Sequence, residues 1–281
     1  MAIYNGYKSK AAAKRDLKAA GFNFSTALGK PESSPKLIKS KLVNVLSAPH
    51  NLSPAKESAK YYKTNWNLCA QASAGCIEAC LHTAGNPIYL EAKIRARLER
   101  TKAFMTMRKA YVALLAFELE ALEIRANKLD MIAAWRPNTT SDYPFHTVAL
   151  TVNYKPVKSL IHAFPNIQAY DYTKITKKAL QFSAGLLPSN YHITFSKSES
   201  NWLDCMKVLK AGGNVAAVFA GKLPDSYAGF KVINGDESDA RFLDKPNVII
   251  GLKAKGKAKN DKSGFTIREL ESVVQYVGMD S

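Results

Sequence analysis

The sequence predicts an α/β fold, in the form of a partial or distorted (β/α) barrel. The 281 residues are 47% hydrophobic, which is enough apolar material for one full core. Short strands rich in Val, Ile and Ala alternate with helices through the second half of the chain. With one strand before them, seven strands are expected, a set that fits a partial barrel. An open doubly wound sheet is the second interpretation.

The first part of the chain is a basic arm, which we assign to residues 1–40. Within it, the segment from Ser9 to Ala20 predicts a short helix that Ser9 can cap and that Gly21 ends. The residues that follow are rich in Ser, Pro and Gly, as is typical of a loop. We expect residues 41–281 to form a single α/β barrel-like domain, with a cysteine loop at 65–87.

The first predicted strand, KLVNVLSA, begins at Lys41 and precedes a long polar segment. Pro87 ends that segment and can open a helix, because proline is tolerated at the first helical position. From Ile88 to about Lys128, neither Pro nor Gly interrupts a helical pattern of apolar residues. This stretch predicts one long helix, or two helices with a bend near Thr106.

The second half of the chain predicts shorter elements that alternate. The predicted strands lie in residues 131–135, 167–174, 191–200, 214–221, 231–239 and 247–256. The predicted helices lie in residues 151–164, 201–213 and 265–277, and residues 175–184 are helical or irregular. The last of these helices is amphipathic and closes the chain. Because parallel strands need crossover connections, this alternation favours a parallel sheet covered by helices.

Polar side chains follow most of these strands, where α/β folds bind their ligands. Charged groups that become buried there need a partner or a ligand. The candidate catalytic residues are therefore Asp142, Lys174, Glu199 and Asp236. The candidates for binding a cofactor are Asn138, Thr139, Ser141, Tyr172, Thr194 and Ser196. For any one of them, a helix cap or an exposed loop position is the alternative.

Three of the four cysteines lie within twelve positions. Cys69, Cys76 and Cys80 have the spacing C-x6-C-x3-C, and His82 follows two residues later. Three interpretations stay open. The thiolates can hold an iron–sulfur cluster, Cys3His can hold structural zinc, or the cysteines are reduced core residues. The fourth cysteine, Cys205, is expected to face the core with Val208 and Leu209.

Several common sequence motifs are missing. The chain has no Walker A loop, no dinucleotide-binding G-x-G-x-x-G, no H-E-x-x-H and no G-x-S-x-G. These absences argue against P-loop nucleoside triphosphatases, common dehydrogenases, zinc peptidases and α/β-hydrolases.

The net charge of +17 is unevenly distributed. Residues 1–64 hold twelve basic against three acidic residues, and a second basic run extends from Lys253 to Lys262. Such surfaces attract nucleic acid through its phosphates, although a solvated face is the plain alternative. No stretch of about 18 apolar residues predicts a membrane span, and the first residues lack a secretory pattern. We therefore expect a cytoplasmic protein without membrane contact.

Several motifs in serial order resemble one family. These are CAQASAGCIEAC, RPNTTSDYP, AYDYTK, HITFSKSESNW, VINGDESDARFLD and IIGLKAKGKAKNDKSGF. From about Leu52 to Phe265 the chain resembles the bacteriophage family called gene product eighty-eight, whose layout is similar to that of radical S-adenosylmethionine enzymes. The resemblance implies that Cys69, Cys76 and Cys80 hold a [4Fe–4S] cluster, with S-adenosylmethionine as the cofactor. It also implies that the protein works in the cytoplasm of the infected host.

Two functions of different classes follow from these patterns. The first is an iron–sulfur protein that acts, in the manner of a radical enzyme, on nucleic acid or a nucleotide. The alternative is a non-catalytic nucleic-acid-binding protein with structural zinc. In both, the basic arm and the Lys253–Lys262 run contact nucleic acid. A host-interaction protein, whose barrel is only a scaffold, is a third hypothesis.

Overall fold

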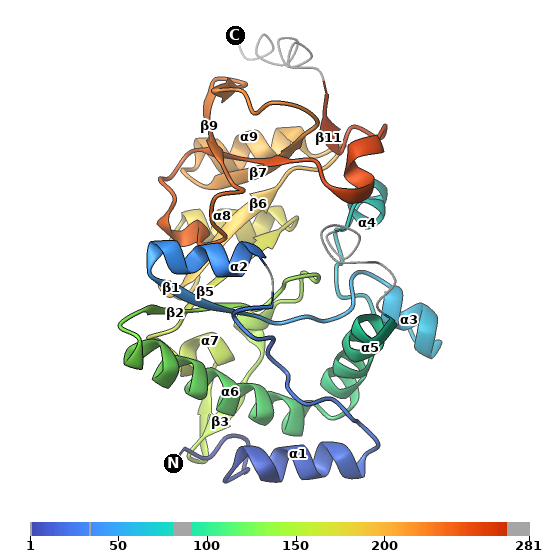
Figure 1. Ribbon diagram of the computed structural model, residues 1–281, viewed down its shortest axis with the longest axis vertical. Coiled ribbons are helices and arrows are strands. Elements are labelled where there is room, and N and C mark those ends of the chain that lie inside the picture. The colour runs from blue at the N-terminus through green and yellow to red at the C-terminus, as the bar shows by residue number, and fades with distance from the viewer. Residues whose placement is uncertain (1, 34, 81–90, 269–281) are drawn as a thin grey trace. The chain divides into compact units, whose positions relative to one another are not determined.

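The computed structural model describes residues 2–33, 35–80 and 91–268 (Figure 1). The chain divides into two compact units, which are described separately. Unit 1 comprises Met1–Ala70, Tyr89–Asp171 and Leu187–His192. Unit 2 comprises Gln71–Ile88, Tyr172–Leu186 and Ile193–Ser281.

The sheet strands of unit 1 are parallel. They are β1 (Val45–Pro49), β2 (Ile132–Arg136) and β5 (Gln168–Thr173), in the order β1-β2-β5. Val45 lies opposite Ile132, and Ala134 lies opposite Gln168. All five residues of β1 are buried, as expected for a parallel strand covered on both faces. The strand predicted from Lys41 begins later, because Lys41–Val43 form a 3-10 helix that ends at Asn44, whose φ is +59°.

Two long helices contribute to the core of unit 1. They are α5 (Glu91–Thr106) and α6 (Arg108–Lys128), and α6 packs on β1 and β2. The chain bends at Met107, whose φ and ψ of −122° and 41° are not helical, so the predicted bend near Thr106 is confirmed. Pro87 and residues 88–90 lie outside the described residues. Shorter helices of the unit are α2 (Pro35–Ser40), α3 (Glu57–Tyr62), η3 (Phe145–Thr147) and α7 (Leu160–Ala163).

Helix α1 (Lys10–Ala19) confirms the predicted N-terminal helix and its cap. The Ser9 hydroxyl accepts a hydrogen bond from the Ala12 amide at 3.2 Å. The helix lies along α6 (Figure 1), where the buried Glu118 carboxylate contacts the Lys10 ammonium at 2.8 Å. Glu118 also accepts hydrogen bonds from the amides of Ala27 and Leu28. A single carboxylate therefore ties two parts of the basic arm to α6.

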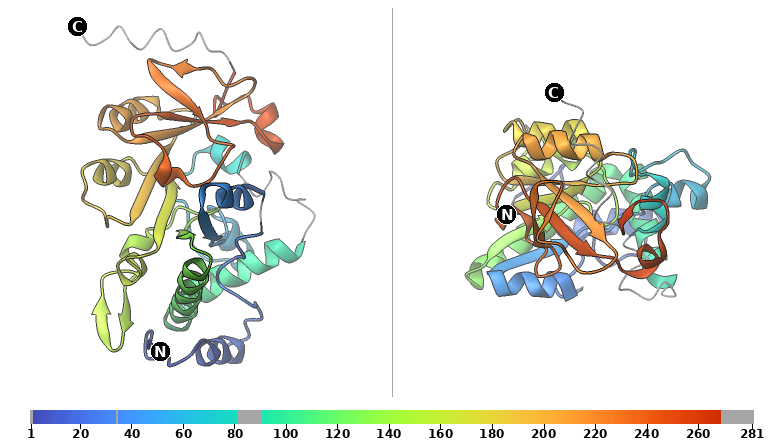
Figure 2. Two further views of the ribbon diagram at one scale, coloured as in Figure 1. Left: turned by 60° about the vertical axis from the view of Figure 1, so that its left-hand side comes forward. Right: turned by 90° about the horizontal axis from the view of Figure 1, so that it is seen from above.

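The helix predicted for residues 151–164 is wrong over most of its length. The chain forms a hairpin of β3 (Leu150–Val152) and β4 (Lys155–Val157), which stands out at the lower left of the left-hand view in Figure 2. Asn153 and Tyr154 have φ of +49° and +66°, the left-handed backbone of a tight hairpin turn. Pro156 also removes an amide that a helix interior needs. Only the short α7 remains of the predicted helix.

Unit 2 also has a mostly parallel sheet. Its strands, in spatial order, are β6 (Tyr191–Ser196), β7 (Asn214–Phe219), β10 (Ile249–Lys253), β9 (Phe230–Asn234) and β8 (Ser226–Tyr227). Among the described strands of this unit, only β8 is antiparallel, to β9, and β11 (Thr266–Ile267) pairs with the end of β7. The helices are α4 (Ala74–Glu78), α8 (Thr176–Ser183) and α9 (Trp202–Lys210), with η4 (Arg241–Leu243) and η5 (Gly256–Asn260).

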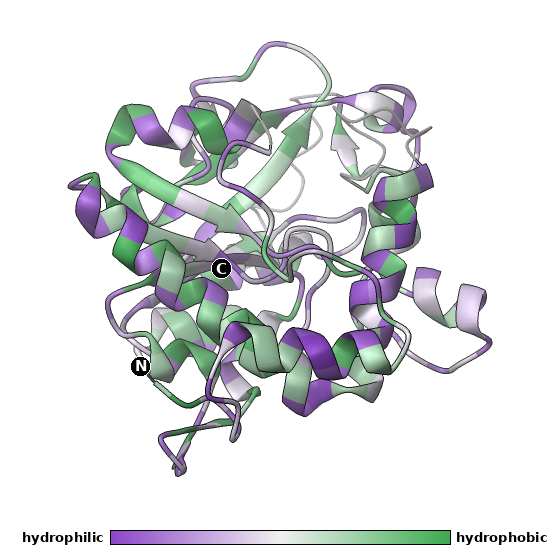
Figure 3. Ribbon diagram, turned by 60° about the horizontal axis from the view of Figure 1, so that its bottom comes forward, coloured by the Kyte–Doolittle hydropathy of each residue, from purple (hydrophilic) through white to green (hydrophobic). Residues whose placement is uncertain are grey.

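The predicted α/β fold with a mostly parallel sheet is confirmed. In Figure 3 the strands are coloured largely from white to green, in agreement with their apolar sequences. The described strands form no closed sheet, and the partial barrel stays an interpretation, as does the boundary at residue 40. The helix predicted from residue 265 is wrong at its start, where β11 forms. Its residues 269–277 lie outside the described ones. No helix in the described ranges is long and apolar enough to cross a membrane.

Candidate functional site

The short helix α4 carries Cys76, and polar contacts hold its first turn. Ser73 caps the helix, because its hydroxyl accepts a hydrogen bond from the Cys76 amide at 3.3 Å. The same hydroxyl donates to the Glu199 carboxylate at 2.6 Å, and the Gly75 amide donates to the other carboxylate oxygen at 2.9 Å. Glu199, which follows β6, therefore fixes the start of the helix that contains Cys76.

The segment after η5 packs closely against α4. A methyl group on Gly75 would lie 2.5 Å from the Ser263 hydroxyl and 2.9 Å from Cβ of Phe265. Only glycine fits at this contact without displacing its neighbours. Cys76 and Cys80 are both half-buried, one within α4 and the other two residues beyond its end.

The candidate residues Glu199 and Lys174 both lie near α4 and the segment that packs against it. Burial on its own would raise the pKa of Glu199. The hydrogen bonds from Ser73 and Gly75 and the positive charge of Lys174 lower it by more, so the pKa lies below its ordinary value. The Lys174 ammonium lies 5.4 Å from the ring centroid of Phe265. The structure thus brings two predicted catalytic residues to the helix that carries a predicted metal ligand.

Cys69 belongs to unit 1 and lies at the carboxyl ends of two strands. Its sulfur accepts a hydrogen bond from the Ala55 amide at 3.2 Å, in the loop after β1. The Cys69 thiol in turn donates to the Thr140 carbonyl at 3.8 Å, in the loop after β2. The predicted position of the cysteine segment, after the first strand and beside the polar residues, is therefore observed for Cys69.

The loop after β2 is shaped by a buried network around Asn138. The Asn138 side chain donates to Asp171 at 2.8 Å and accepts from the Ser141 hydroxyl at 2.7 Å. Asp171 also accepts a hydrogen bond from the Tyr191 hydroxyl at 2.6 Å, and burial raises the pKa of Tyr191 well above its ordinary value. Asn138 and Ser141 thus hold the loop, and their binding of a cofactor stays a prediction.

The other candidates lie in this loop and in β5 and β6. The Thr139 hydroxyl is buried and makes no hydrogen bond within the described residues. Asp142 is half-buried, and its amide donates to the Leu68 carbonyl at 2.7 Å, next to Cys69. Tyr172 and Ser196 are half-buried, and Thr194 is fully buried opposite Asn214 of β7. Their roles as cofactor ligands stay predictions.

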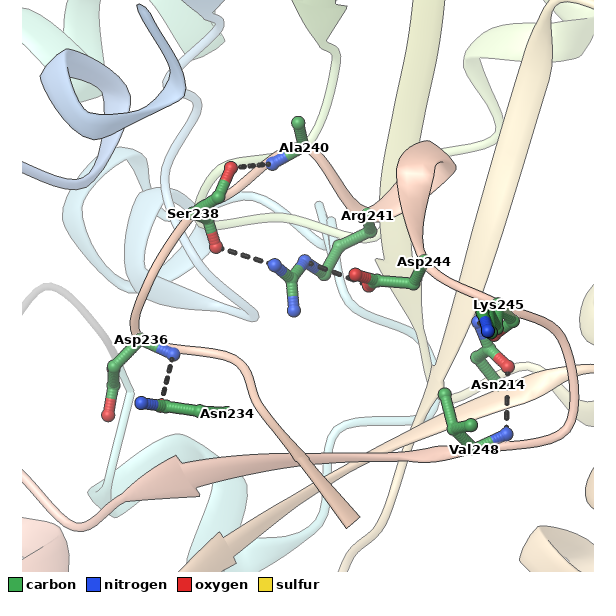
Figure 4. A network of polar contacts seen from close by, with 9 residues as sticks. All are labelled: Asn214, Asn234, Asp236, Ser238, Ala240, Arg241, Asp244, Lys245 and Val248. Carbon is green, nitrogen blue, oxygen red and sulfur yellow. Dashed lines mark hydrogen bonds and ion pairs between the residues drawn. The ribbon is translucent and has the colours of Figure 1, made fainter. Parts of the chain in front are cut away.

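Asp236 is joined to the end of β10. Its carboxylate accepts hydrogen bonds from the Lys253 amide at 3.0 Å and from the Lys255 ammonium at 2.7 Å. Figure 4 shows the same loop, in which Arg241 reaches between Ser238 and Asp244. Arg241 is buried. It donates to the Ser238 carbonyl at 2.7 Å and pairs with Asp244 at 3.3 Å. Arg241 is not among the residues predicted from the sequence, although DARFLD, like the other strand ends, combines both charges.

A basic pocket of unit 2 brings together residues that are not among the site residues predicted from the sequence. It has a volume of about 250 Å³ and is lined by Lys197, Tyr227, Asp261, Lys262, Gly264, Thr266, Ile267 and Arg268. Lys197 comes from the end of β6, and five of the others come from the segment between η5 and the end of β11. The sequence does mark two of these residues, because Lys262 ends the basic run and Lys197 lies among the polar residues after β6.

The donor chemistry of the cysteines fits a metal ligated by thiolates. None of the four cysteines is in a disulfide, and Cys69, Cys76 and Cys80 are partly accessible. Within residues 2–33, 35–80 and 91–268, no three His, Cys, Asp or Glu side chains are grouped as metal ligands. His82, the fourth ligand of the zinc alternative, lies outside the described residues. Cys69 is placed in unit 1, and Cys76 and Cys80 are placed in unit 2.

Comparison with known proteins gives one match. The family model described as Gene product 88 matches residues 4–269. No curated protein and no solved structure matches the chain.

Proposed function

The chain belongs to the gene product 88 family of phage proteins, and from this starting point we propose that it is an iron–sulfur protein. In this proposal Cys69, Cys76 and Cys80 hold a [4Fe–4S] cluster, and the polar strand ends bind S-adenosylmethionine. The parallel strands act as a partial barrel, in the manner of radical S-adenosylmethionine enzymes. The substrate is a nucleic acid or a nucleotide, and the protein works in the host cytoplasm.

The contact between Glu199 and the start of α4 carries this proposal. A helix of five residues is too short to be stable by itself, so its position depends on side-chain contacts. Here an ionised carboxylate and a serine hydroxyl fix the turn that contains Cys76. Such precise placement suits a metal ligand, because metal sites need ligands held by neighbouring groups. A cysteine that served only as an apolar core residue would be fully buried, as Cys205 is.

The surroundings of Cys69 support the same proposal. Hydrogen bonds from amides to cysteine sulfur are among the features that set the reduction potential of iron–sulfur clusters. The Ala55 amide makes such a bond. A cluster, when bound, would supply one electron at a time and an iron with an open coordination position.

The residues of the chain would orient a cofactor and hold charge around it. The Thr139 hydroxyl has no hydrogen-bonding partner in the described part of the chain and can donate to a bound molecule. The Lys174 ammonium can hold an anionic group, and ionised Glu199 keeps α4 in place. Asp142 and Asp236 stay candidates for positioning the substrate.

The alternative function keeps the nucleic acid and replaces the cluster with structural zinc. Cys69, Cys76, Cys80 and His82 would then be the ligands, and the protein would bind without catalysis. The basic pocket favours a nucleic-acid partner under either function.

The formation of 5′-deoxyadenosine distinguishes the two functions. Protein purified without oxygen would be reduced with dithionite and incubated with S-adenosylmethionine. The proposed enzyme forms 5′-deoxyadenosine, and Cys76→Ser abolishes it while Cys205→Ser does not. A protein that contains an iron–sulfur cluster but forms no 5′-deoxyadenosine would contradict the radical reaction and leave the cluster in place.

A further inference from the structure

The basic pocket gathers more positive charge than its own carboxylate can balance. Three cationic side chains line it, from Lys197, Lys262 and Arg268, against the single carboxylate of Asp261. That carboxylate already accepts hydrogen bonds from the Ser263 hydroxyl at 2.6 Å and from the Thr266 amide at 2.9 Å. The pocket therefore carries a net positive charge close to one point of the surface, which attracts anions.

Two of the three cations, Lys197 and Arg268, are positioned by carbonyl groups rather than by acids. The Lys197 ammonium donates to the Gly264 carbonyl at 2.6 Å. The Arg268 guanidinium donates to the Asp261 carbonyl at 2.7 Å and also to the Lys259 carbonyl. Among the described residues, no carboxylate forms an ion pair with any of the three. Carbonyl oxygens orient the cations but leave their charge available to a ligand.

The backbone turn at Gly264 produces this arrangement. Gly264 has a φ of +90°, a conformation that residues with a side chain rarely adopt. This turn directs the Gly264 carbonyl toward Lys197 and lets β11 pair with β7. The Asp261 carboxylate also stabilises the turn, because it accepts a hydrogen bond from the Ser263 amide.

Size and lining indicate the class of ligand. The volume of about 250 Å³ lies below the range of about 300–1,000 Å³ for pockets that enclose a drug-sized molecule. A pocket of this size can hold a single charged group and part of the molecule to which that group is attached. Tyr227 also lines the pocket, with its ring in T-shaped contact with those of Trp202 and Phe219. Aromatic side chains beside basic ones are typical of sites for single-stranded nucleic acid.

We propose that the basic pocket binds a phosphate group of a nucleotide or of a nucleic-acid strand. Lys197, Lys262 and Arg268 donate to the phosphate oxygens, and Tyr227 contacts the attached sugar or base. The inference rests on the proposed function, because it assigns the phosphate site of the nucleic acid or nucleotide on which the protein acts. It does not depend on which metal the cysteines hold.

The state of Lys197 agrees with an anionic ligand. Burial lowers the pKa of Lys197 below its ordinary value, and Cys205, Glu199 and Asp261 only partly offset this effect. A bound phosphate would place negative charge beside the ammonium and favour its protonated form.

Calorimetric titration at constant ionic strength tests the proposal. The probes are inorganic phosphate, thymidine monophosphate and a short oligothymidylate. The proteins are the wild type, Lys197→Gln, Lys262→Gln and the control Lys231→Gln. Lys262 and Lys231 are both exposed, so neither substitution is expected to disturb folding. We expect each pocket variant to weaken binding at least tenfold and the control to bind like the wild type.

Every outcome decides between the sources of phosphate or overturns the proposal. Binding of thymidine monophosphate that the pocket variants lose indicates a free nucleotide, and the same pattern with oligothymidylate alone indicates the backbone of a strand. Absence of binding, or equal weakening by Lys231→Gln, overturns the proposal that the basic pocket binds phosphate. Iron and sulfide are measured on the same samples. Phosphate binding without iron contradicts only the cluster, and iron without phosphate binding contradicts only this inference.

Discussion

The Ser73 hydroxyl donates a hydrogen bond to the Glu199 carboxylate at 2.6 Å and in turn caps the helix that carries Cys76. The two residues lie 126 positions apart in the chain. Their contact anchors the cysteine helix to the end of β6 in unit 2. If the thiols hold a metal, Glu199 positions a ligand without touching the metal itself.

Removal of the Glu199 charge is expected to loosen α4. In Glu199→Gln the side chain keeps one acceptor oxygen, and its new amide group faces a donor. A hydrogen bond to a charged group contributes about 1.5–3 kcal/mol, and partial exposure reduces this to about 1 kcal/mol here. The rate at which iodoacetamide alkylates Cys76 in the apoprotein should rise about fivefold. Glu78→Gln, an exposed position on the same helix, is the control and should leave the rate unchanged.

The contact at Gly75 predicts a matched pair of glycine variants. Gly75→Ala places a methyl group 2.9 Å from Cβ of Phe265, so α4 or the following segment must shift. Overpacking of this kind costs about 1–3 kcal/mol. Gly221→Ala meets no atom within 4 Å and should change the free energy of unfolding by less than about 0.5 kcal/mol. Urea unfolding of both variants measures the difference, and equal stability would show that α4 does not pack on residues 263–265.

His50 predicts a pH dependence of stability. Burial lowers its pKa to about 3, and its ring nitrogens contact the Pro137 carbonyl at 3.0 Å and the Tyr111 hydroxyl at 2.9 Å. The pKa is about 6.5 in the unfolded chain, so the unfolded state binds the proton first. His50 therefore stabilises the fold fully above about pH 6.5. This contribution falls by about 1.4 kcal/mol per pH unit as the pH drops toward about 3.

The free energy of unfolding, measured at several pH values between about 6 and about 5, checks this slope. Carboxylates change little in that range, and the difference between wild type and His50→Gln isolates His50. A variant with the same slope as the wild type would contradict the assignment.

The basic arm predicts a salt dependence of nucleic-acid binding. Arg15 and Lys18 of α1 are exposed, whereas Lys10 pairs with buried Glu118. Each phosphate contact contributes about 0.9 to the slope of log K against log salt for duplex DNA. Arg15→Gln and Lys18→Gln should each reduce the slope by about that amount, and Lys10→Gln should reduce it less. Filter binding at several salt concentrations measures the slopes, and unchanged slopes would remove the arm from the interface.

Local sequence patterns predicted most of the elements but not their long-range contacts. The bend near Thr106 and the Ser9 cap follow from residues close in the chain, and both are observed. Cys205 is buried with Val208 and Leu209, as its helical spacing indicated. The hairpin at Asn153 and Tyr154 was missed because neither residue is glycine, although both adopt left-handed backbone.

The candidate site was only partly predictable, because it also depends on contacts between segments that are far apart in the chain. Glu199 was selected because it follows a strand, but its bond to Ser73 depends on how two distant segments fold together. The basic pocket joins Lys197 to a segment more than sixty residues later, which no local spacing could indicate. Asp236 follows β9, and the structure adds its bonds to Lys253 and Lys255, while its catalytic role stays a prediction.

The most direct test of the proposed function is the content of iron, acid-labile sulfide and zinc in protein purified without oxygen. We expect about four iron and four sulfide per chain, the content of a [4Fe–4S] cluster. Cys76→Ser should lose most of both, and Cys205→Ser should keep them. Wild-type protein without iron and sulfide, or Cys76→Ser with the full amount, would contradict the cluster. Stoichiometric zinc in the wild type would instead support the non-catalytic alternative.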